Sequence, residues 1–229
     1  MPAPLPHPRV AVVIPALDEA ATIGRVIARL PPVAAVIVAD NGSTDDTVAQ
    51  AEAAGARVVP APRRGYGSAC QAGIAEAQRL GADVVVILDA DLADDPAELP
   101  RLLAPIQRGD ADLVLSERTR LAEPGALLSH QRFGNRLATT LIAWTAGARF
   151  RDMGPFRAIR MDALLSLRME DPTWGWNVEM ALKAARQGLQ WVEVPMAYRA
   201  REGVSKISGT VRGSVRAGGR ILWAVWRYR

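Results

Sequence analysis

Two aspartates, Asp89 and Asp91, follow directly after five consecutive apolar residues at 84–88 (VVVIL). A short apolar run rich in β-branched side chains is typical of a strand buried on both faces. Residues two apart on an extended segment point the same way, so the two carboxylates would repel each other. A divalent cation removes that repulsion, and carboxylate oxygens suit Mg²⁺ or Mn²⁺. The alternative is a polar strand end followed by a helix cap at Asp94 or Asp95.

Strand and helix patterns alternate through the first half of the chain and must position these aspartates. The predicted strands cover 9–14, 35–39, 57–60, 84–88 and 112–116. The predicted helices between and after them end near residues 30, 54, 80 and 107. This order specifies an α/β fold with a mostly parallel central sheet flanked by helices, in which loops at the carboxyl ends of the strands bind ligands.

Acidic or glycine-rich residues occupy several of these strand-end loops. Asp18 and Glu19 follow the first strand, Asp40 follows the second, and Gly65 and Gly67 precede the third helix. Because the carboxyl ends of parallel strands share one edge of the sheet, we expect these residues to converge with the two aspartates. The glycine spacing matches neither a dinucleotide-binding fingerprint nor a Walker loop. The convergence favours a nucleotide site, in which Asp40 would bind the base and Glu19 the ribose.

The composition narrows the class of protein. A chain of 229 residues with 49% hydrophobic residues and mixed charge is typical of one globular α/β domain. The single cysteine, Cys70, excludes an intrachain disulfide, fits a reducing cytoplasm and would be a packed core thiol. Only two histidines, His7 and His130, are present, which disfavours a histidine-rich metal centre or a Ser-His-Asp triad. No run approaches the roughly 18 apolar residues of a membrane-spanning helix.

The net charge of +4 hides an asymmetry between the two halves of the chain. Residues 1–110 have a balance of −5 and residues 111–229 a balance of +9. An acidic half that holds a metal and a basic half that holds phosphates would suit an anionic substrate bound between them. An unevenly charged solvated surface is the alternative.

Several motifs occur in a characteristic order along the chain. They are 13–19 (VIPALDE), 40–47 (DNGSTDDT), 64–69 (RGYGSA), 89–92 (DADL), 152–159 (DMGPFRAI), 175–180 (GWNVEM) and 198–208 (YRAREGVSKIS). With these motifs the chain resembles family 2 glycosyltransferases over residues 9–225, and within them the dolichyl-phosphate mannose or glucose synthases and their soluble bacterial relatives. The resemblance implies a GT-A fold, a UDP- or GDP-hexose donor, a divalent metal and inversion at the anomeric carbon.

The resemblance also implies roles for individual residues. Asp89 and Asp91 would hold the metal, and Asp91 would be catalytic. The implied nucleotide-sugar-binding residues are Pro15, Ala16, Asp18, Glu19, Asp40, Arg64, Gly67, Asp89, Ala90, Asp91, Arg118, Arg201 and Lys206. The chain departs from the family pattern at Asp18 and Asn41, where asparagine and aspartate are common, and at Ala93, where the polyprenol-phosphate synthases often have a metal-binding glutamine.

Acceptor groups are expected in the second half of the chain. Glu179 begins a predicted helix that runs to residue 187, and it would be catalytic as a general base on an acceptor hydroxyl. It could instead be a first-turn acid favoured by the helix dipole, and a phosphate acceptor would need no base. Arg157 and Trp176 are the predicted acceptor-binding residues.

Basic residues crowd the C-terminal segment. Arg201 and Lys206 flank Gly203 in a polar loop that could close on the diphosphate or remain solvated. From 211 to 229 a helical period predicts two faces. The apolar face holds Val211, Val215, Leu222, Val225 and Trp226, and the basic face holds Arg212, Arg216, Arg220 and Arg227. Such a basic helix with tryptophans could lie peripherally on an anionic membrane surface, or could dock on the domain.

We therefore expect a Pro-rich lead (1–8), one GT-A catalytic domain (9–210) and a basic amphipathic helix (211–229). Within the domain, 9–116 would be the nucleotide-binding half and 117–210 the acceptor half. The predicted function is transfer of a hexose from a UDP- or GDP-sugar. The acceptor would be polyprenyl phosphate at the cytoplasmic face of the membrane, or a soluble hydroxyl compound or glycan.

Two other functions compete with this prediction. A sugar-1-phosphate nucleotidyltransferase would normally have a glycine-rich basic loop after its first strand, where this chain has the acidic loop 15–19 (PALDE). A non-enzymatic protein that binds membranes or nucleic acid is suggested by 8 Lys/Arg against 1 Glu in 199–229. It leaves the acidic strand ends unexplained, so no nucleic-acid partner is expected.

Overall fold

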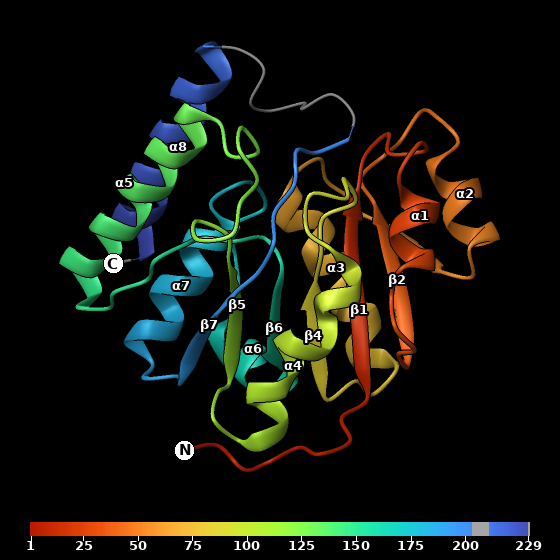
Figure 1. Cartoon of the computed structure of the whole chain (residues 1–229), viewed down its shortest axis with the longest axis horizontal. Helices are drawn as coiled ribbons and strands as arrows, with labels where there is room; N and C mark the ends of the chain where they lie inside the picture. The colour runs from red at the N-terminus through yellow and green to blue at the C-terminus, as the bar shows by residue number, and fades with distance from the viewer. Residues whose placement is uncertain (203–210, 229) are drawn as a thin grey trace.

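The computed structural model describes residues 1–202 and the backbone of 211–228, with side chains from 219 onward. In this part of the chain seven strands form a single sheet in the order β3-β2-β1-β4-β6-β5-β7 (Figure 1). The strands are β1 (Val10–Ala16), β2 (Ala35–Asp40), β3 (Arg57–Pro60), β4 (Val84–Ile87), β5 (Leu113–Glu117), β6 (Arg157–Arg160) and β7 (Trp191–Pro195). The helices are α1 (Ile23–Ala28), α2 (Thr47–Ala53), α3 (Tyr66–Arg79), η1 (Pro96–Glu98, 3-10), α4 (Leu99–Arg108), α5 (Ser129–Ala146), α6 (Met161–Leu167), α7 (Trp176–Arg186) and α8 (Val211–Tyr228).

The sheet is mostly parallel, which confirms the predicted fold class. Strands β1 to β4 are parallel to their neighbours among themselves, as are β5 and β7, whereas β6 runs antiparallel between β4 and β5. Strand β6 is not among the strands predicted from the sequence, because its four residues (RAIR) are too few to show a period. Since β6 pairs with both β4 and β5, the two halves of the chain share one sheet.

Apolar side chains fill both faces of this sheet. Along β1 and β4, Val13 and Val85 face one core, and Val12 and Val84 face the other. Helices α3, α5 and α7 contribute to the first core, and α1 and α4 to the second. Burial on both faces explains why β4 is an uninterrupted apolar run rather than an alternating one.

The C-terminal helix α8 lies beside α5 and packs against α5 and α7 (Figure 1). It buries Ala224, Val225 and Tyr228, while Leu222 and Trp226 are 52% and 62% exposed. The predicted apolar face is therefore divided in exposure in this part: Val225 is buried against the protein, whereas Leu222 and Trp226 face solvent. The side chains of 211 and 215 lie outside the described residues.

None of the described helices combines the length and the apolar character needed to cross a bilayer. This agrees with the absence of a long apolar run in the sequence.

Candidate active site

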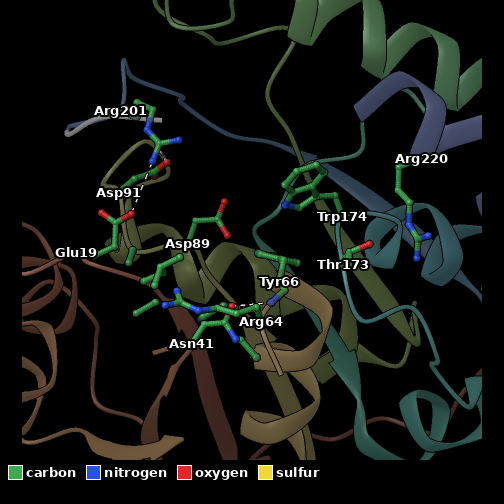
Figure 2. Close-up of a pocket in the computed structure, with 16 residues that line it drawn as sticks. Glu19, Asn41, Arg64, Tyr66, Asp89, Asp91, Thr173, Trp174, Arg201 and Arg220 are labelled. Carbon is green, nitrogen blue, oxygen red and sulfur yellow. Dashed lines mark hydrogen bonds and ion pairs between the residues drawn. The ribbon is translucent and has the colours of Figure 1, made fainter. Parts of the chain in front are cut away.

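A cavity of about 650 Å³ opens at the carboxyl ends of β1 and β4 (Figure 2). Its volume lies in the range of about 300–1,000 Å³ that is typical of small-molecule sites. The lining residues are Pro15, Ala16, Leu17, Glu19, Asn41, Arg64, Gly65, Tyr66, Ala69, Asp89, Ala90, Asp91, Thr173, Trp174, Arg201 and Arg220. Eight of the predicted donor-binding residues are thus brought together: Pro15, Ala16, Glu19, Arg64, Asp89, Ala90, Asp91 and Arg201.

Asp89 and Asp91 enter the cavity from the end of β4 (Figure 2). Burial raises the pKa of Asp89, and the charge of Asp91 raises it further. The pair therefore favours a neighbouring cation. The residues that the structure describes include no cluster of three or more His, Cys, Asp or Glu able to hold a metal. In many Mg²⁺ sites, however, the protein supplies only one or two carboxylate ligands, and water and substrate phosphates supply the others.

The rim of the cavity above Asp91 is formed by the segment 201–202. The guanidinium of Arg201 lies 3.6 Å from Asp91 Oδ2 and 3.8 Å from Glu19 Oε1. The amide of Glu202 donates to the Asp91 carbonyl at 3.0 Å, and its carboxylate pairs with Arg25 on α1. This segment places a positive charge directly over the acidic pair. Lys206, predicted to act with Arg201, lies outside the described residues.

Asn41 fastens the loop that precedes α3. Its side-chain amide donates to the Arg63 carbonyl and accepts from the Gly65 amide, both at 2.7 Å. Its neighbour Asp40 accepts from the amide of Gly42 at 3.1 Å and closes the turn. Asn41, rather than the predicted Asp40, therefore lines the cavity.

Asp18 also lies beside the cavity and not in its lining. Its carboxylate accepts from the Thr44 amide at 2.6 Å, and its own amide donates to the Ser43 hydroxyl at 2.9 Å. Asp18 thus joins the β1 loop to the β2 loop, and its direct contact with the donor stays a prediction.

The glycines of the RGYGSA motif allow two pieces of backbone to meet. A Cβ atom on Gly67 would overlap the carbonyl oxygen of Asp171, and one on Gly65 would overlap that of Pro172. The Ser68 amide donates to the Pro172 carbonyl at 3.0 Å. A glycine at position 67 is therefore required by the protein's own 170–175 loop, and its contact with the donor stays a prediction.

Arg118 is already paired within the protein. Its Nε and Nη2 atoms donate to the two carboxylate oxygens of Asp152, each at 2.8 Å, and the guanidinium lies 5.0 Å from the centre of the Tyr198 ring. Asp152 is 1% exposed, so the pair lies below the surface. Arg118 does not line the cavity, and its contact with the donor stays a prediction.

Arg157 and Trp176, the predicted acceptor-binding residues, are both fully buried. Arg157 donates to the Gly154 carbonyl and contacts the Met180 sulfur at 3.7 Å, and burial lowers the pKa of its guanidinium. Neither side chain lines the cavity, and their contact with an acceptor stays a prediction. Both side chains are packed in the core beneath the cavity.

Glu179 is also fully buried, away from the cavity lining. Its carboxylate accepts from the amides of Glu170 and Asp171 at 2.8 and 2.7 Å and pairs with Lys183 at 2.7 Å. These contacts give Glu179 a structural role, and its role as a general base stays a prediction. Glu179 holds the 170–175 loop, which presents Thr173 and Trp174 to the cavity.

Similarity to known proteins identifies the family of this chain. The model of glycosyl transferase family 2 matches residues 11–167. The chain belongs to this family. An uncharacterized glycosyltransferase of Mycobacterium tuberculosis is 38% identical over 211 residues, which cover 90% of this chain and 93% of the relative. The undecaprenyl-phosphate mannosyltransferase of Micrococcus luteus is 31% identical, over 90% of each chain.

The solved structures agree with this assignment. Glucosyl-3-phosphoglycerate synthase from Mycobacterium tuberculosis, crystallised with Mn²⁺, UDP-glucose and phosphoglyceric acid, is 28% identical with a TM-score of 0.74. The match covers 96% of this chain and 80% of that one. The GT-A fold and the resemblance to the polyprenyl-phosphate sugar synthases are therefore confirmed.

In this family 2 glycosyltransferase, Ala93 occupies the position where the polyprenol-phosphate synthases often have a glutamine, and its side chain makes only apolar contacts. Ala93 packs with Leu127 and Tyr198, and only its amide serves the site, by donating to Asp91 Oδ1 at 3.0 Å. Asp95 caps η1 through its carboxylate, as the alternative reading of this strand end expected. Two neighbouring carboxylates, Asp89 and Asp91, and a helix cap at Asp95 thus both occur within residues 89–95.

Several lining residues of the glycosyltransferase were not singled out from the sequence. Tyr66, Thr173 and Trp174 lie inside or beside recognised motifs. The site predictions there were made for neighbouring residues of the motifs instead. Arg220 comes from α8, far along the chain. Only the packing of α8 on α5 and α7 brings it to the cavity.

Proposed function

We propose that this glycosyltransferase moves a hexose from a UDP- or GDP-sugar to a phosphate-bearing acceptor, foremost polyprenyl phosphate. The observation that carries the proposal is the pair Asp89 and Asp91, which opens into the cavity opposite Arg201. The cavity is lined by mixed polar and apolar groups, as a site for a nucleotide-sugar must be.

Asp89 and Asp91 would hold Mg²⁺ or Mn²⁺, which when bound would stabilise the charge developing on the diphosphate leaving group. Arg201 stands where it would add a second positive charge to the same phosphates. Asn41 and Arg64 would lie next to the nucleoside of the donor, since both line the cavity beside the glycine loop. Direct attack of the acceptor on the anomeric carbon would invert its configuration.

The buried position of Glu179, the predicted general base, supports a phosphate acceptor. Glu179 is buried and held by two amides and Lys183, so it would not take a proton from a hydroxyl. A phosphate oxygen is already a nucleophile and needs no base. The relative from Micrococcus luteus is named for undecaprenyl phosphate, which supports this reading.

A soluble acceptor is the second candidate. The solved glucosyl-3-phosphoglycerate synthase was crystallised with phosphoglyceric acid, a small phosphorylated molecule. Both candidates carry a phosphate group, and they differ in the presence of a lipid tail.

The first test measures donor binding by calorimetry, with UDP and GDP, in the presence and absence of Mn²⁺. We expect one nucleotide to bind at least about tenfold more tightly with the metal, a difference of about 1.4 kcal/mol. Asp91→Asn should remove this gain, because the amide retains an oxygen for the Ala93 amide but loses the charge. Asp110→Asn, at an exposed ion pair, is the matched control. Equal metal dependence in wild type and Asp91→Asn would contradict the proposal.

We also propose peripheral contact with the cytoplasmic face of a membrane. Helix α5 exposes Phe133 and Trp144, eleven residues apart and so on one stripe, and α8 exposes Leu222 and Trp226 on another. Exposed arginines accompany them, including Arg132 on α5. Apolar and basic side chains together favour an anionic lipid surface.

A further inference from the structure

The cavity has a second cationic end, which belongs to neither the acidic pair nor Arg201. Arg220 of α8 lines the cavity there, together with Thr173 and Trp174. Figure 2 shows these three side chains across the cavity from Asp89 and Asp91. The Arg220 side chain is 28% exposed and lines the cavity, whereas its Nε atom is buried.

Arg220 is held in one orientation by its surroundings. Its Nη2 donates to Asp171 Oδ2 at 2.9 Å, and its guanidinium stacks on the Trp223 ring with 3.9 Å between the Cζ atom and the ring centre. Asp171 is fully buried, and its other oxygen accepts from the Thr173 amide and hydroxyl at 2.7 and 2.9 Å. A planar cation fixed on two sides loses little freedom when it binds a ligand.

The bonding capacity of this arginine is only partly used. A guanidinium has five N–H donors, and among the described residues Asp171 is the single hydrogen-bond acceptor that Arg220 reaches. The unused donors suit the oxygens of a phosphate, which arginine binds with two parallel hydrogen bonds. Trp174 in the cavity lining supplies apolar surface for the carbon chain attached to that phosphate, and Trp223, which is 39% exposed, stacks on the guanidinium.

We propose that Arg220, supported by Thr173 and Trp174, binds the phosphate monoester of the acceptor, so that α8 completes the acceptor end of the site. This inference rests on the proposed function, because it needs a donor bound at Asp89 and Asp91. The hexose would then lie between the two cationic ends. A polyprenyl phosphate and a small phosphorylated metabolite share the recognised group, and the exposed tryptophans of α8 favour the former.

The test is calorimetric titration of the full chain, loaded with Mn²⁺ and the nucleotide that binds, using farnesyl phosphate and glycerol 3-phosphate as probes. Arg220→Gln should weaken binding of the phosphate probe about tenfold or more, since a charge-assisted hydrogen bond contributes roughly that factor. Nucleotide affinity should change less than twofold. Arg227→Gln, on the same helix but at an exposed ion pair with Glu170, should change neither affinity. Arg220→Lys should restore part of the loss.

Removing Arg220 alone leaves Asp171 buried without its cation, which could unfold the loop. The double variant Asp171→Asn/Arg220→Gln removes both charges and should fold with the same loss of phosphate affinity. Phosphate affinity that survives in this variant would overturn the inference, and so would a wild type that binds nucleotide but neither probe. Failure of the wild type to bind any nucleotide would instead overturn the proposed function. Binding of farnesyl phosphate but not glycerol 3-phosphate would indicate a lipid acceptor. Binding of both probes would indicate that the site recognises the phosphate without requiring the lipid tail.

Discussion

At the scale of single residues, the arginines near the site differ in whether a buried carboxylate already binds them. Arg118 is paired through two hydrogen bonds with Asp152, whereas Arg201 lies 3.6 Å or more from its carboxylate partners and remains a third exposed. A fully paired guanidinium stabilises the fold, while a loosely paired one at a cavity is available to a ligand.

The first prediction concerns this buried pair. Arg118→Gln should lower the free energy of unfolding by about 3 kcal/mol, because Asp152 would remain buried without its cation. Urea denaturation measures the change. Arg108→Gln, at an exposed pair with Asp110, should leave the denaturation midpoint unchanged. A shift of equal size in both variants would show that the buried pair has no special weight.

A second prediction concerns Cys70, which is fully buried, as its small-residue neighbourhood suggested. Burial raises the pKa of its thiol, and the nearby Asp89 charge adds to this. Below about pH 8.5 both folded and unfolded states keep the proton. Above it the unfolded thiol ionises first, so the free energy of unfolding should fall by about 1.4 kcal/mol per pH unit.

The matched variant for this test is Cys70→Ala, measured by urea denaturation at several pH values above the unfolded thiol pKa. Its overall stability is lower because of the lost side-chain volume, but its pH dependence should be flatter by the amount just given. Parallel curves for the two proteins would show that the buried thiol ionises normally.

At the scale of elements, the site depends on how closely α3 approaches the 170–175 loop. Gly67→Ala should favour the helix by about 1 kcal/mol from intrinsic propensity alone. Its methyl group would nevertheless overlap the Asp171 carbonyl and push away the loop that presents Thr173 and Trp174. We expect a net loss of stability and weaker nucleotide binding, measured by thermal denaturation and calorimetry.

Gly134→Ala provides the control for this substitution. Gly134 lies inside α5, and an added Cβ there makes only an ordinary contact, 3.8 Å from Ile221 Cδ1. This variant should be slightly more stable than wild type and should bind nucleotide normally. Stabilisation by Gly67→Ala as well would mean that the loop moves without cost.

At the scale of the whole molecule, the acidic cavity edge and the exposed apolar stripes of α5 and α8 lie on different elements of one protein. The stripes are large side chains in water: Trp144 is 86% exposed and Phe133 is 70% exposed. Helix α8 serves both regions, since Arg220 lines the cavity while Trp226 faces outward. Contact with a bilayer would thus bring a lipid-linked acceptor close to the cavity.

The corresponding prediction is binding to phosphatidylglycerol-containing vesicles, measured by cosedimentation, with weaker binding to phosphatidylcholine vesicles and at high salt. Trp226→Ser should weaken binding roughly tenfold, from the loss of about 1–2 kcal/mol of apolar burial. Leu165→Ser, at an exposed apolar residue of α6, should have no effect. Equal binding by both variants would place the contact elsewhere.

Much of the nucleotide-binding half could be predicted because its signals are local. The apolar run at 84–88 predicted β4, and the acidic loops after β1, β2 and β4 followed from strand order alone. In a parallel sheet the carboxyl ends of the strands must meet at one edge. That rule was enough to bring Glu19, Asp89 and Asp91 to a common cavity.

The second half could not be predicted in the same way, because burial depends on contacts between distant segments. From their motifs, Arg157, Trp176 and Glu179 were predicted to act on the acceptor. Packing of α7 under the site buries all three side chains. Conversely, the helical period placed Arg220 only on a basic helix face, and it becomes a cavity residue through the docking of α8. Periodicity and spacing thus determined the sheet and its acidic edge, whereas tertiary packing decided which charged side chains remain accessible, because exposure is a property of the assembled surface and not of the chain.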